Sequence, residues 1–489
     1  MTSPYSRILI AGTGGDSGKT IVSLGLLASW NDAELVVRAF KKGPDFIDAA
    51  WLGWAARSPG RNLDTYMMGS EVVRRSFLEH GVSDGLNLIE GNRGLLDGVD
   101  ATGSHSSAGL ARLLECPVVL VLSPVKVTAT AAATVLGCRQ LAPEVEIAGV
   151  ILNRIRGERH ERVVRQAIEE HAGVPVLGAL PNLTGPTLVS RHLGLVPPAE
   201  HGPAAQLRAT LVQNLQQYVD LDRLLTIARS ARPLVAASEQ PSADAAETGR
   251  IPGEKVRIGF FSDTAFTFYY PENLEALERG GATLTAISAL AHEKLPTIDA
   301  LYIGGGFPET HTRELAANTA LLAAVRRAAG DGLPIYAECG GLMYLAESLE
   351  WRGETIPLSG VLPIQVRMHG RPQGHGYCRM TVDTANPFLP VGLELRGHEF
   401  HYSSVQSVQS VQSLKGETAG VKTAFAVSKG QGCFDQRDGI VQGNVLASYL
   451  HLHALGSPEW ARGLIAAAVA YHDGVRGDGP PPSSAAEKV

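Results

Sequence analysis

The sequence lacks the features that mark secreted, membrane-spanning and zinc-binding chains. Its five cysteines are scattered and form no CxxC pair, which argues against a disulfide framework or a zinc site. No apolar run approaches the ~20 residues that span a bilayer. No charged stretch followed by an apolar stretch precedes Gly12, so we expect no signal peptide. These absences predict a cytoplasmic protein with reduced thiols and no membrane contact.

An excess of charge of one sign is also missing. The 43 Lys and Arg residues are balanced by 49 Asp and Glu residues, for a net charge of −6, and no block of basic residues stands out. A nucleic-acid-binding function is therefore not expected. The length of 489 residues exceeds what one hydrophobic core usually serves, so two or three domains are expected.

The N-terminal part of the chain alternates short apolar runs with amphipathic stretches. Strands that alternate with helices form a doubly wound, mainly parallel sheet, so we predict an α/β domain over residues 1–235. The expected strands are residues 8–11, 35–40, 86–90, 117–122 and 148–153, and the clearest helical patterns are residues 20–30 and 159–171.

A second α/β domain is predicted after a break in composition. Residues 236–254 are small, polar and proline-bearing, as in a linker. The α/β rhythm then restarts, which places a second domain at residues 255–472. A threefold Ser-Val-Gln repeat at 404–412 is expected to be a surface loop. The polar tail at 473–489 is expected to be disordered.

A glycine-rich turn, GTGGDSGKT, follows the first predicted strand. Glycines let consecutive backbone N–H groups point at phosphate oxygens, and the following helix adds its positive end. Thr13 stands where the strict P-loop pattern has its first glycine, so the alternative is a chance Gly-Lys-Thr in a glycine-rich turn. The predicted nucleotide-binding residues are Gly12, Thr13, Gly14, Gly15, Asp16, Ser17, Gly18, Lys19 and Thr20.

Acidic residues near the predicted strand ends are candidates for a magnesium site. Thr20 is the P-loop type of ligand, and Mg²⁺ otherwise prefers carboxylates and water. Glu90 ends an apolar strand and Asp45 lies in KKGPD, so both are predicted metal ligands; the alternative for each is a solvated strand-end acid. Lys41 is a candidate catalytic residue that neutralises a transferring phosphoryl group, unless it is a surface lysine.

A second strand–turn–helix pattern, IYAECGG, carries a cysteine at its turn. Cys339 is predicted to be a nucleophile with an exposed thiol, its thiolate stabilised by the following helix. His451, after a strand-like run, is the candidate base. Gly305, Gly306 and Gly340 are predicted to form an oxyanion hole from backbone N–H groups. The alternative is a buried structural cysteine, with one of fifteen histidines nearby by chance.

Together these segments resemble the glutamine-dependent cobyrinate a,c-diamide synthases, over residues 7–465. The matching strings are AGTGGDSGKT, FKKGPDFID, RNLDTYM, LIEGNRGLLDG, GVILNR, SRHLGLVP, DTAFTFYYPENLEALE, YIGGGFPE, YAECGGLMYL, RGHEFHYS and ASYLHLH.

The resemblance implies an N-terminal ATP- and Mg²⁺-binding domain similar to dethiobiotin synthetase and a C-terminal class I-like glutamine amidotransferase domain. It implies that Cys339 attacks glutamine with His451 as its activator, and that Asn153 contacts the nucleotide base, with a strand-end cap as the alternative. Family members phosphorylate acetate carboxylates of a corrin ring with ATP, and ammonia from glutamine displaces the phosphate. We therefore expect glutamine and a tetrapyrrole as partners, and leave a homodimer open.

Three departures from the family pattern qualify these expectations. Class I amidotransferases usually carry His-x-Glu, whereas His453 stands in the third position here, so the base is expected to lack a carboxylate. Asn92 and Arg93 replace usual residues of the acceptor loop, and Lys42 replaces an apolar one. Sirohaem or nickel-sirohydrochlorin amidation is therefore an alternative. The aromatic residues Phe266, Phe268, Tyr269 and Tyr270 are candidates for macrocycle contact or for the core.

Two further rivals differ in chemistry. Dethiobiotin-type carboxylation would need no cysteine elbow, and a ParA-like regulatory ATPase would lack the whole amidotransferase half. Cys339 and its surroundings argue against both.

Overall fold

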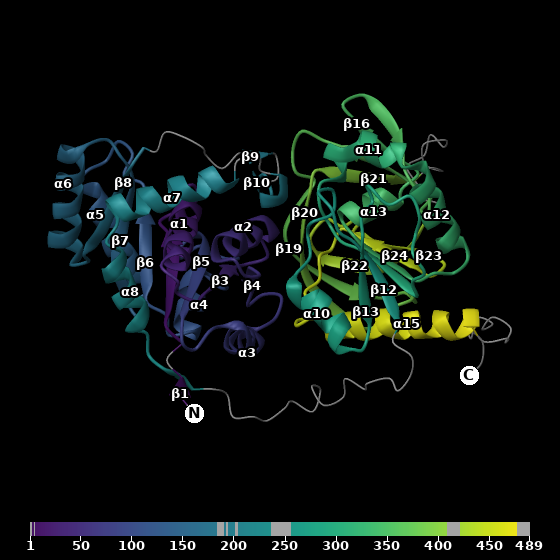
Figure 1. The fold of residues 1–489 in the computed structure, drawn as a ribbon, viewed down its shortest axis with the longest axis horizontal. Helices are drawn as coiled ribbons and strands as arrows, with labels where there is room; N and C mark the ends of the chain where they lie inside the picture. The colour runs from purple at the N-terminus through teal and green to yellow at the C-terminus, as the bar shows by residue number, and fades with distance from the viewer. Residues whose placement is uncertain are drawn as a thin grey trace. The chain divides into compact units, whose positions relative to one another are not determined.

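The computed structural model describes residues 2–3, 5–182, 190–191, 194–200, 204–235, 256–407 and 421–476. The chain forms two compact units, Met1–Gln240 and Pro241–Val489 (Figure 1). The linker predicted at 236–254 lies outside the described residues. Within the described ranges, no helix is long and apolar enough to cross a membrane.

The first unit is built on a seven-stranded sheet in which every neighbouring pair is parallel. The central strands are fully buried apolar runs, as expected when helices cover both faces. In spatial order the strands are β4 (Arg61–Leu63), β3 (Val37–Lys42), β5 (Leu86–Gly94), β2 (Arg7–Gly12), β6 (Val118–Leu122), β7 (Ile147–Ile155) and β8 (Val176–Pro181).

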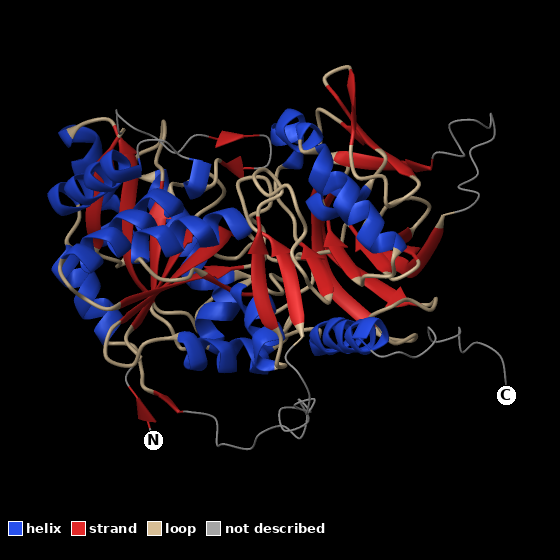
Figure 2. Ribbon diagram, turned by 45° about the vertical axis from the view of Figure 1, so that its right-hand side comes forward, coloured by secondary structure: helices blue, strands red, loops and turns tan. Residues whose placement is uncertain are grey.

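Helices lie on either side of this sheet (Figure 2). They are α1 (Lys19–Asp32), α2 (Phe46–Ala56), α3 (Ser70–His80), α4 (Ser107–Leu113), α5 (Thr130–Leu141), α6 (Glu158–Ala167), α7 (Ala204–Tyr218) and α8 (Leu221–Arg229). Short pieces complete the unit: β1 (Thr2–Ser3) pairs with β11 (Leu234–Val235), β9 (Ser190–Arg191) pairs with β10 (Gly194–Leu195), and single turns cover Ile168–Ala172 and Pro198–Glu200. The doubly wound parallel sheet predicted from the sequence is confirmed.

The second unit contains a nine-stranded mixed sheet, parallel over its first five strands and antiparallel beyond them. In spatial order the strands are β13 (Thr283–Ile287), β12 (Arg257–Phe261), β14 (Ala300–Ile303), β15 (Ile335–Glu338), β24 (Val445–Ser448), β23 (Arg437–Gln442), β22 (Lys422–Lys429), β19 (Gly374–Val382) and β20 (Glu394–His401). A four-stranded sheet follows the order β17 (Glu354–Pro357), β16 (Ser348–Trp351), β18 (Ile364–Met368) and β21 (Ser403–Ser407).

Strand alternation divides the core of this unit into two clusters, one on each face of the large sheet. Leu301 and Ile303 pack into one cluster, and Tyr302 between them packs into the other. Tyr336 of β15 joins the Tyr302 cluster. The same period of two directs the Glu338 side chain to the Tyr302 face, directly before the chain turns at Cys339.

The helices of this unit are α10 (Pro271–Arg279), α11 (Thr312–Ala317), α12 (Thr319–Gly330), α13 (Gly340–Leu345) and α15 (Pro458–Arg476), with a 3₁₀ turn at Pro308–His311. Two expectations need adjustment here. The tail predicted from residue 473 begins inside α15, and residues 477–489 lie outside the described part. The repeat predicted as a loop from 404 begins in β21, which pairs with β18; residues 408–412 are not described.

Candidate functional site

The glycine-rich turn connects β2 to α1 at the carboxyl edge of the first sheet. Gly18 precedes the helix with φ of 96°, a left-handed conformation that favours glycine. A Cβ on Gly12 would lie 2.4 Å from the Ser17 hydroxyl oxygen, so the loop is closed tightly at its base. Gly14 and Gly15 have nothing within 4 Å of the Cβ position, so the tip of the loop is open. This geometry fits a phosphate cradle.

Asn153 holds this loop rather than standing apart from it. Its Nδ2 donates to the Ser17 carbonyl at 3.0 Å, and its Oδ1 accepts the Arg154 N–H at 2.9 Å. A Cβ on Gly18 would lie only 2.0 Å from Asn153 Nδ2. Both polar ends of the amide are thus engaged, as in the strand-end cap that was the alternative. Recognition of a base by Asn153 stays a prediction.

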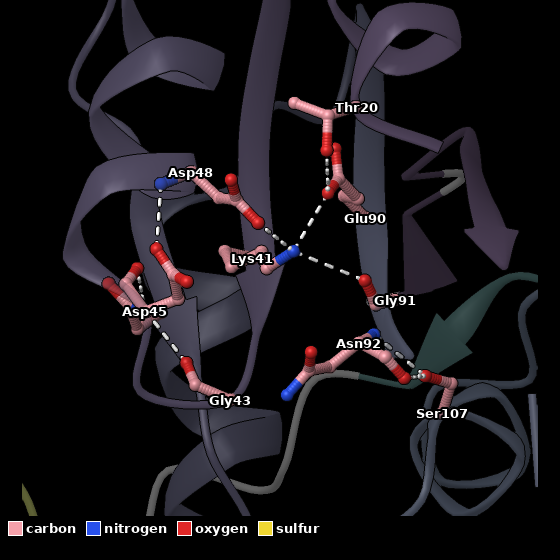
Figure 3. A network of polar contacts seen from close by, with 10 residues as sticks. Thr20, Lys41, Gly43, Asp45, Asp48, Glu90, Gly91, Asn92 and Ser107 are labelled. Atoms are coloured by element: carbon pink, nitrogen blue, oxygen red, sulfur yellow. Dashed lines mark hydrogen bonds and ion pairs between the residues drawn. The ribbon is translucent and has the colours of Figure 1, made fainter. Parts of the chain in front are cut away.

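Lys41 is the centre of a buried charge network beneath the loop. Its Nζ lies 2.6 Å from Asp48 Oδ2 and 2.7 Å from Glu90 Oε1, and Figure 3 shows it between these two carboxylates. Thr20 Oγ1 donates to the same Glu90 oxygen at 3.0 Å. Burial alone lowers the pKa of the Lys41 ammonium, but Asp48 and Glu90 outweigh it and raise that pKa. Lys41 is therefore a buried cation and not a surface lysine.

Lys19 adds a second positive charge to the same place. It is largely buried at the start of α1, and burial together with the charge of Lys41 lowers its pKa. Two ammonium groups next to an open loop of backbone N–H groups form an anion site. A bound polyphosphate would supply the negative charge that offsets their repulsion.

Asp45 caps a helix, and its role as a metal ligand stays a prediction. Its Oδ1 accepts the Asp48 N–H at 2.7 Å, so it is the N-cap of α2 (Figure 3). Asp48, which the sequence reasoning missed, is the carboxylate that reaches Lys41. The motif FKKGPDFID contains both acids. Only the position at which α2 begins shows that Asp45 caps the helix and that Asp48, three residues later, pairs with Lys41.

The predicted metal ligands Thr20 and Glu90 do come together. Glu90 Oε2 is buried without a hydrogen-bond partner among the described residues, while Oε1 receives Thr20 and Lys41. A free buried carboxylate oxygen beside a P-loop hydroxyl fits a divalent cation that also binds phosphate oxygens and water. In the described ranges, no group of three His, Cys, Asp or Glu side chains forms a metal site by itself.

Cys339 sits at a strained turn between β15 and α13. Its φ of 47° and ψ of −97° are rare for a residue with a side chain, and such strain is typical of nucleophile elbows. Its N–H donates to the Ser448 carbonyl at 2.7 Å, which ties the turn to the end of β24. The elbow that the sequence predicted is therefore present.

The environment of the thiol differs from the prediction. Only 6% of Cys339 is exposed, and it packs within the core cluster that holds Leu301. Burial raises the pKa of its thiol, and the Glu309 carboxylate raises it further. The prediction of an exposed thiol with a stabilised thiolate is wrong, because the six-residue helix α13 starts inside the core.

The predicted oxyanion glycines and the histidine meet at this elbow. A Cβ on Gly340 would lie 3.0 Å from the Gly306 nitrogen, and a Cβ on Gly305 would lie 2.6 Å from His451 Cε1. Only glycine lets the two loops and the imidazole approach this closely. Cys339 is the residue next to Gly340, so four predicted site residues and the nucleophile share one small region. Their catalytic roles stay predictions.

His451 has a carboxylate partner after all. Its Nδ1 lies 3.3 Å from Glu338 Oε2, although no acid follows it in sequence. His453, in the position of the usual glutamate, instead lies 3.6 Å from Glu272 through its Nε2. The expectation of a base without a carboxylate is wrong, because an acid from a neighbouring strand reaches the ring. Sequence reasoning missed Glu338 although it directly precedes Cys339.

A second histidine, His398, lies against the candidate base. The ring of His398 stacks on His451 with centroids 4.9 Å apart, and their backbones pair: the His451 N–H donates to the His398 carbonyl at 2.9 Å. Burial lowers the pKa of His398 well below its usual value, and the neighbouring His451 lowers it further. The lowered pKa favours the uncharged form of the His398 ring, which lies against His451.

The aromatic segment that includes Phe268 and Tyr269 holds the glycine loop of this site in place. Phe268 N–H donates to the Gly305 carbonyl at 3.0 Å, and Tyr269 Oη accepts the Gly304 N–H at 2.8 Å. Phe266 and Tyr270 are both 1% exposed. Of the two readings of these aromatics, the structure favours core packing, because their backbone and rings position the glycine loop.

The acceptor-loop departures lie at the end of β5. Arg93 is exposed with φ of 50°, and the Asn92 N–H is held by Ser107 Oγ at 3.1 Å (Figure 3). Lys42 on β3 is buried, and burial lowers its pKa. Within this loop, Arg93 adds one cationic side chain, and its backbone lies next to Gly12 of the phosphate loop.

Both halves match described domain families. Residues 8–195 match the CobQ/CobB/MinD/ParA nucleotide binding domain, and residues 257–459 match the CobB/CobQ-like glutamine amidotransferase domain. The chain is therefore a glutamine amidotransferase joined to a nucleotide-binding domain. This combination sets aside the ParA-like and dethiobiotin-type rivals, neither of which needs the second domain.

Curated relatives share this arrangement over nearly their whole length. A cobyrinate a,c-diamide synthase from Magnetococcus marinus is 43% identical over 94% of this chain and 96% of its own. Those from Methanothermobacter thermautotrophicus and Salmonella typhimurium are 38% and 36% identical, over 93% and 96% of this chain and 98% and 99% of their own. The chain belongs to the cobyrinate a,c-diamide synthase family, and it is an enzyme of the glutamine-dependent carbon–nitrogen ligase class.

Proposed function

We propose that this protein uses ATP and glutamine to amidate the a and c acetate carboxylates of a cobyrinate-like tetrapyrrole. The observation that carries the proposal is the pairing of two sites on one chain: an open phosphate loop over the Thr20–Glu90–Lys41 network, and a strained Cys339 elbow beside His451. The first supports phosphoryl transfer and the second supports release of ammonia. We also propose that the reaction takes place in the cytoplasm; a homodimer stays open.

The C-terminal chemistry follows from the elbow. Cys339 gives its proton to His451, and the sulfur attacks the amide carbon of glutamine. Backbone N–H groups of Gly306 and Gly340 face the oxygen that becomes negative. Imidazolium returns the proton to the leaving nitrogen, ammonia departs, and water then cleaves the thioester to give glutamate. Because burial raises the pKa of the thiol, the transfer of its proton to His451 is the step that makes the sulfur nucleophilic.

The N-terminal chemistry needs a leaving group, because a carboxylate is a poor acyl donor. Mg²⁺, held by Thr20 and Glu90, would neutralise charge on the transferring phosphoryl group. Lys19 and Lys41 supply further positive charge at the same loop. Lys41 also holds the buried Glu90 carboxylate in place through their ion pair. Ammonia attacks the acyl phosphate, and phosphate leaves.

A direct test incubates purified protein with ATP, Mg²⁺, glutamine and cobyrinate. Each amidation replaces an OH by NH₂ and lowers the mass by about 1 Da, so a diamide is about 2 Da lighter. Mass spectrometry should show both losses, with ADP formed in step. Absence of amidation on every tetrapyrrole offered would refute the proposal.

A second acceptor is favoured by one feature. Asn92, Arg93 and Lys42 make the acceptor side more polar and cationic than the family pattern. Such groups suit a macrocycle whose carboxylates differ from those of cobyrinate, such as sirohaem or nickel-sirohydrochlorin. The same assay with these macrocycles, compared at equal concentration by kcat/KM, decides between them.

A further inference from the structure

We propose that Glu338, the residue directly before the nucleophile, is the positioning residue that orients His451 for glutamine hydrolysis. This rests on the proposed function of the elbow. The observation is the contact of 3.3 Å between Glu338 Oε2 and His451 Nδ1, in a chain whose usual acid position is occupied by His453. The carboxylate comes from the nucleophile's own strand rather than from the segment that carries the base.

The strand register brings this carboxylate to the segment that carries His451. β15 and β24 are parallel, with Glu338 opposite Ser448, three residues before His451. Cys339 packs in the core cluster of Leu301, whereas the Glu338 carboxylate contacts Tyr302, which belongs to the cluster on the other face of the sheet.

The Glu338 carboxylate is held firmly. It is 1% exposed, Oε2 also accepts from the Tyr302 hydroxyl at 3.3 Å, and Oε1 accepts the Leu452 N–H at 3.3 Å. Asn273 secures the same segment by donating to the Leu452 carbonyl at 2.9 Å. Three donors on a buried carboxylate fix its position before any substrate arrives.

The imidazole is fixed from its other sides as well. Gly305 lies against Cε1, the carbon between the two ring nitrogens, and His398 stacks on one face. A carboxylate oxygen accepts a hydrogen bond from an N–H group, so the contact with Glu338 Oε2 places a hydrogen of His451 on Nδ1. Nε2 is then the basic nitrogen, available for the Cys339 proton. Once His451 takes that proton, the carboxylate stabilises the imidazolium.

A matched control lies in the same domain. Glu272 and His453 form a second buried pair at 3.6 Å, and both side chains are fully buried. Neither Glu272 nor His453 takes part in the proposed reaction. Loss of a buried carboxylate beside a histidine can therefore be compared at two positions, only one of which touches the base.

The experiment measures glutamine hydrolysis and ammonia-driven amidation separately in the full chain. We expect Glu338→Gln to lower the glutaminase kcat by about 10²–10⁴-fold, with KM for glutamine within about threefold of wild type. The same variant should keep its ATP-dependent amidation of cobyrinate with ammonium chloride, which shows that it folds. Glu272→Gln should keep both the glutaminase kcat and the ammonia reaction within about threefold.

Other outcomes overturn the inference. A Glu338→Gln kcat within about threefold of wild type, or an equal loss in Glu272→Gln, would show that the carboxylate has no special role. If Glu338→Gln does not fold, ¹⁵N spectra of histidine-labelled wild type, assigned with His451→Gln, replace it: hydrogen on Nδ1 supports the inference and hydrogen on Nε2 overturns it. Wild type that hydrolyses glutamine but amidates no tetrapyrrole would refute only the proposed acceptor chemistry.

Discussion

Two strand–turn–helix junctions in this chain differ in what they present at the turn: one presents backbone N–H groups and the other a side chain. At β2–α1 the ligand binds backbone N–H groups, so the turn is made of glycines and a left-handed Gly18 costs little. At β15–α13 the chemistry needs a side chain at the turn, so Cys339 takes a positive φ that strains a non-glycine residue. Part of the glycine backbone at this junction comes from another segment: Gly305 and Gly306, which follow β14, lie against Gly340.

The two junctions also treat their buried carboxylates differently. Glu90 is paired with the Lys41 ammonium, a cation that is part of the protein. Glu338 accepts a hydrogen bond from a tyrosine hydroxyl and contacts the His451 ring, which becomes a full positive partner when it takes the Cys339 proton in the proposed reaction. The first carboxylate serves a charge that is always present, and the second serves a charge that appears during the reaction.

The largest difference between the two junctions is expected when the candidate nucleophile is removed. Cys339→Ala should lower glutamine-dependent amidation by about 10⁴-fold or more, because no thioester can form. Ammonium chloride should restore amidation, since the phosphate-loop site is untouched. ADP release with each nitrogen source measures this, with Cys138→Ala on α5 as the control. Retained glutamine use in Cys339→Ala would contradict the assignment of the two junctions.

Removal of Lys41 should affect both nitrogen sources. In Lys41→Met, Asp48 and Glu90 lose their shared cation, so unfolding should become easier by about 3–5 kcal/mol. ATP use should fall by about 10²–10³-fold. Thermal denaturation and ADP release measure the two effects. A variant with normal stability would mean that the network is not the buried ion pair described here.

Replacing His453 by glutamate should destabilise the protein and should not increase its glutaminase activity. The sequence pattern suggests that His453→Glu rebuilds a usual catalytic acid, but the new carboxylate would be buried next to Glu272. We expect a loss of about 3 kcal/mol in the free energy of unfolding and no gain in glutaminase. Urea denaturation and glutamate release test this. Faster glutamine hydrolysis would show that Glu338 does not fill the role of that acid.

Reactivity of the thiol should reveal its burial. Because alkylation needs thiolate and the pKa of Cys339 is raised, iodoacetamide should modify it slowly at neutral pH. The rate should keep rising as pH passes the range in which ordinary thiols are already ionised. Peptide mapping after timed exposure measures it against denatured protein. A plateau below pH 8 would indicate a thiolate already stabilised in the resting state.

The smallest effect is expected in the phosphate loop. Gly18→Ala forces a side chain into a left-handed position and towards Asn153, so nucleotide affinity should fall by about tenfold. Gly137→Ala on α5, with open space around its Cβ position, is the control and should bind nucleotide normally. Calorimetric titration with ATP compares them. Equal affinity in both variants would mean that the Gly18 conformation is unimportant.

The sequence predicted what depends on short strings. The apolar runs of the first half, the break before residue 256 and the turns at Gly12 and Cys339 each lie within about a dozen residues, so local geometry follows from them. The strands of the first unit agree with these expectations. The family resemblance rests on the same strings, and full-length relatives bear it out.

Only the tertiary structure decided which side chains meet. Glu338 and His451 are 113 positions apart, and Lys41 and Glu90 are 49 apart; parallel strand neighbours bring each pair together. The sequence could not separate Asp45 from Asp48, since a helix cap is a matter of where the helix begins. Nor could it foresee a buried thiol, because burial depends on what packs over the elbow from elsewhere in the chain.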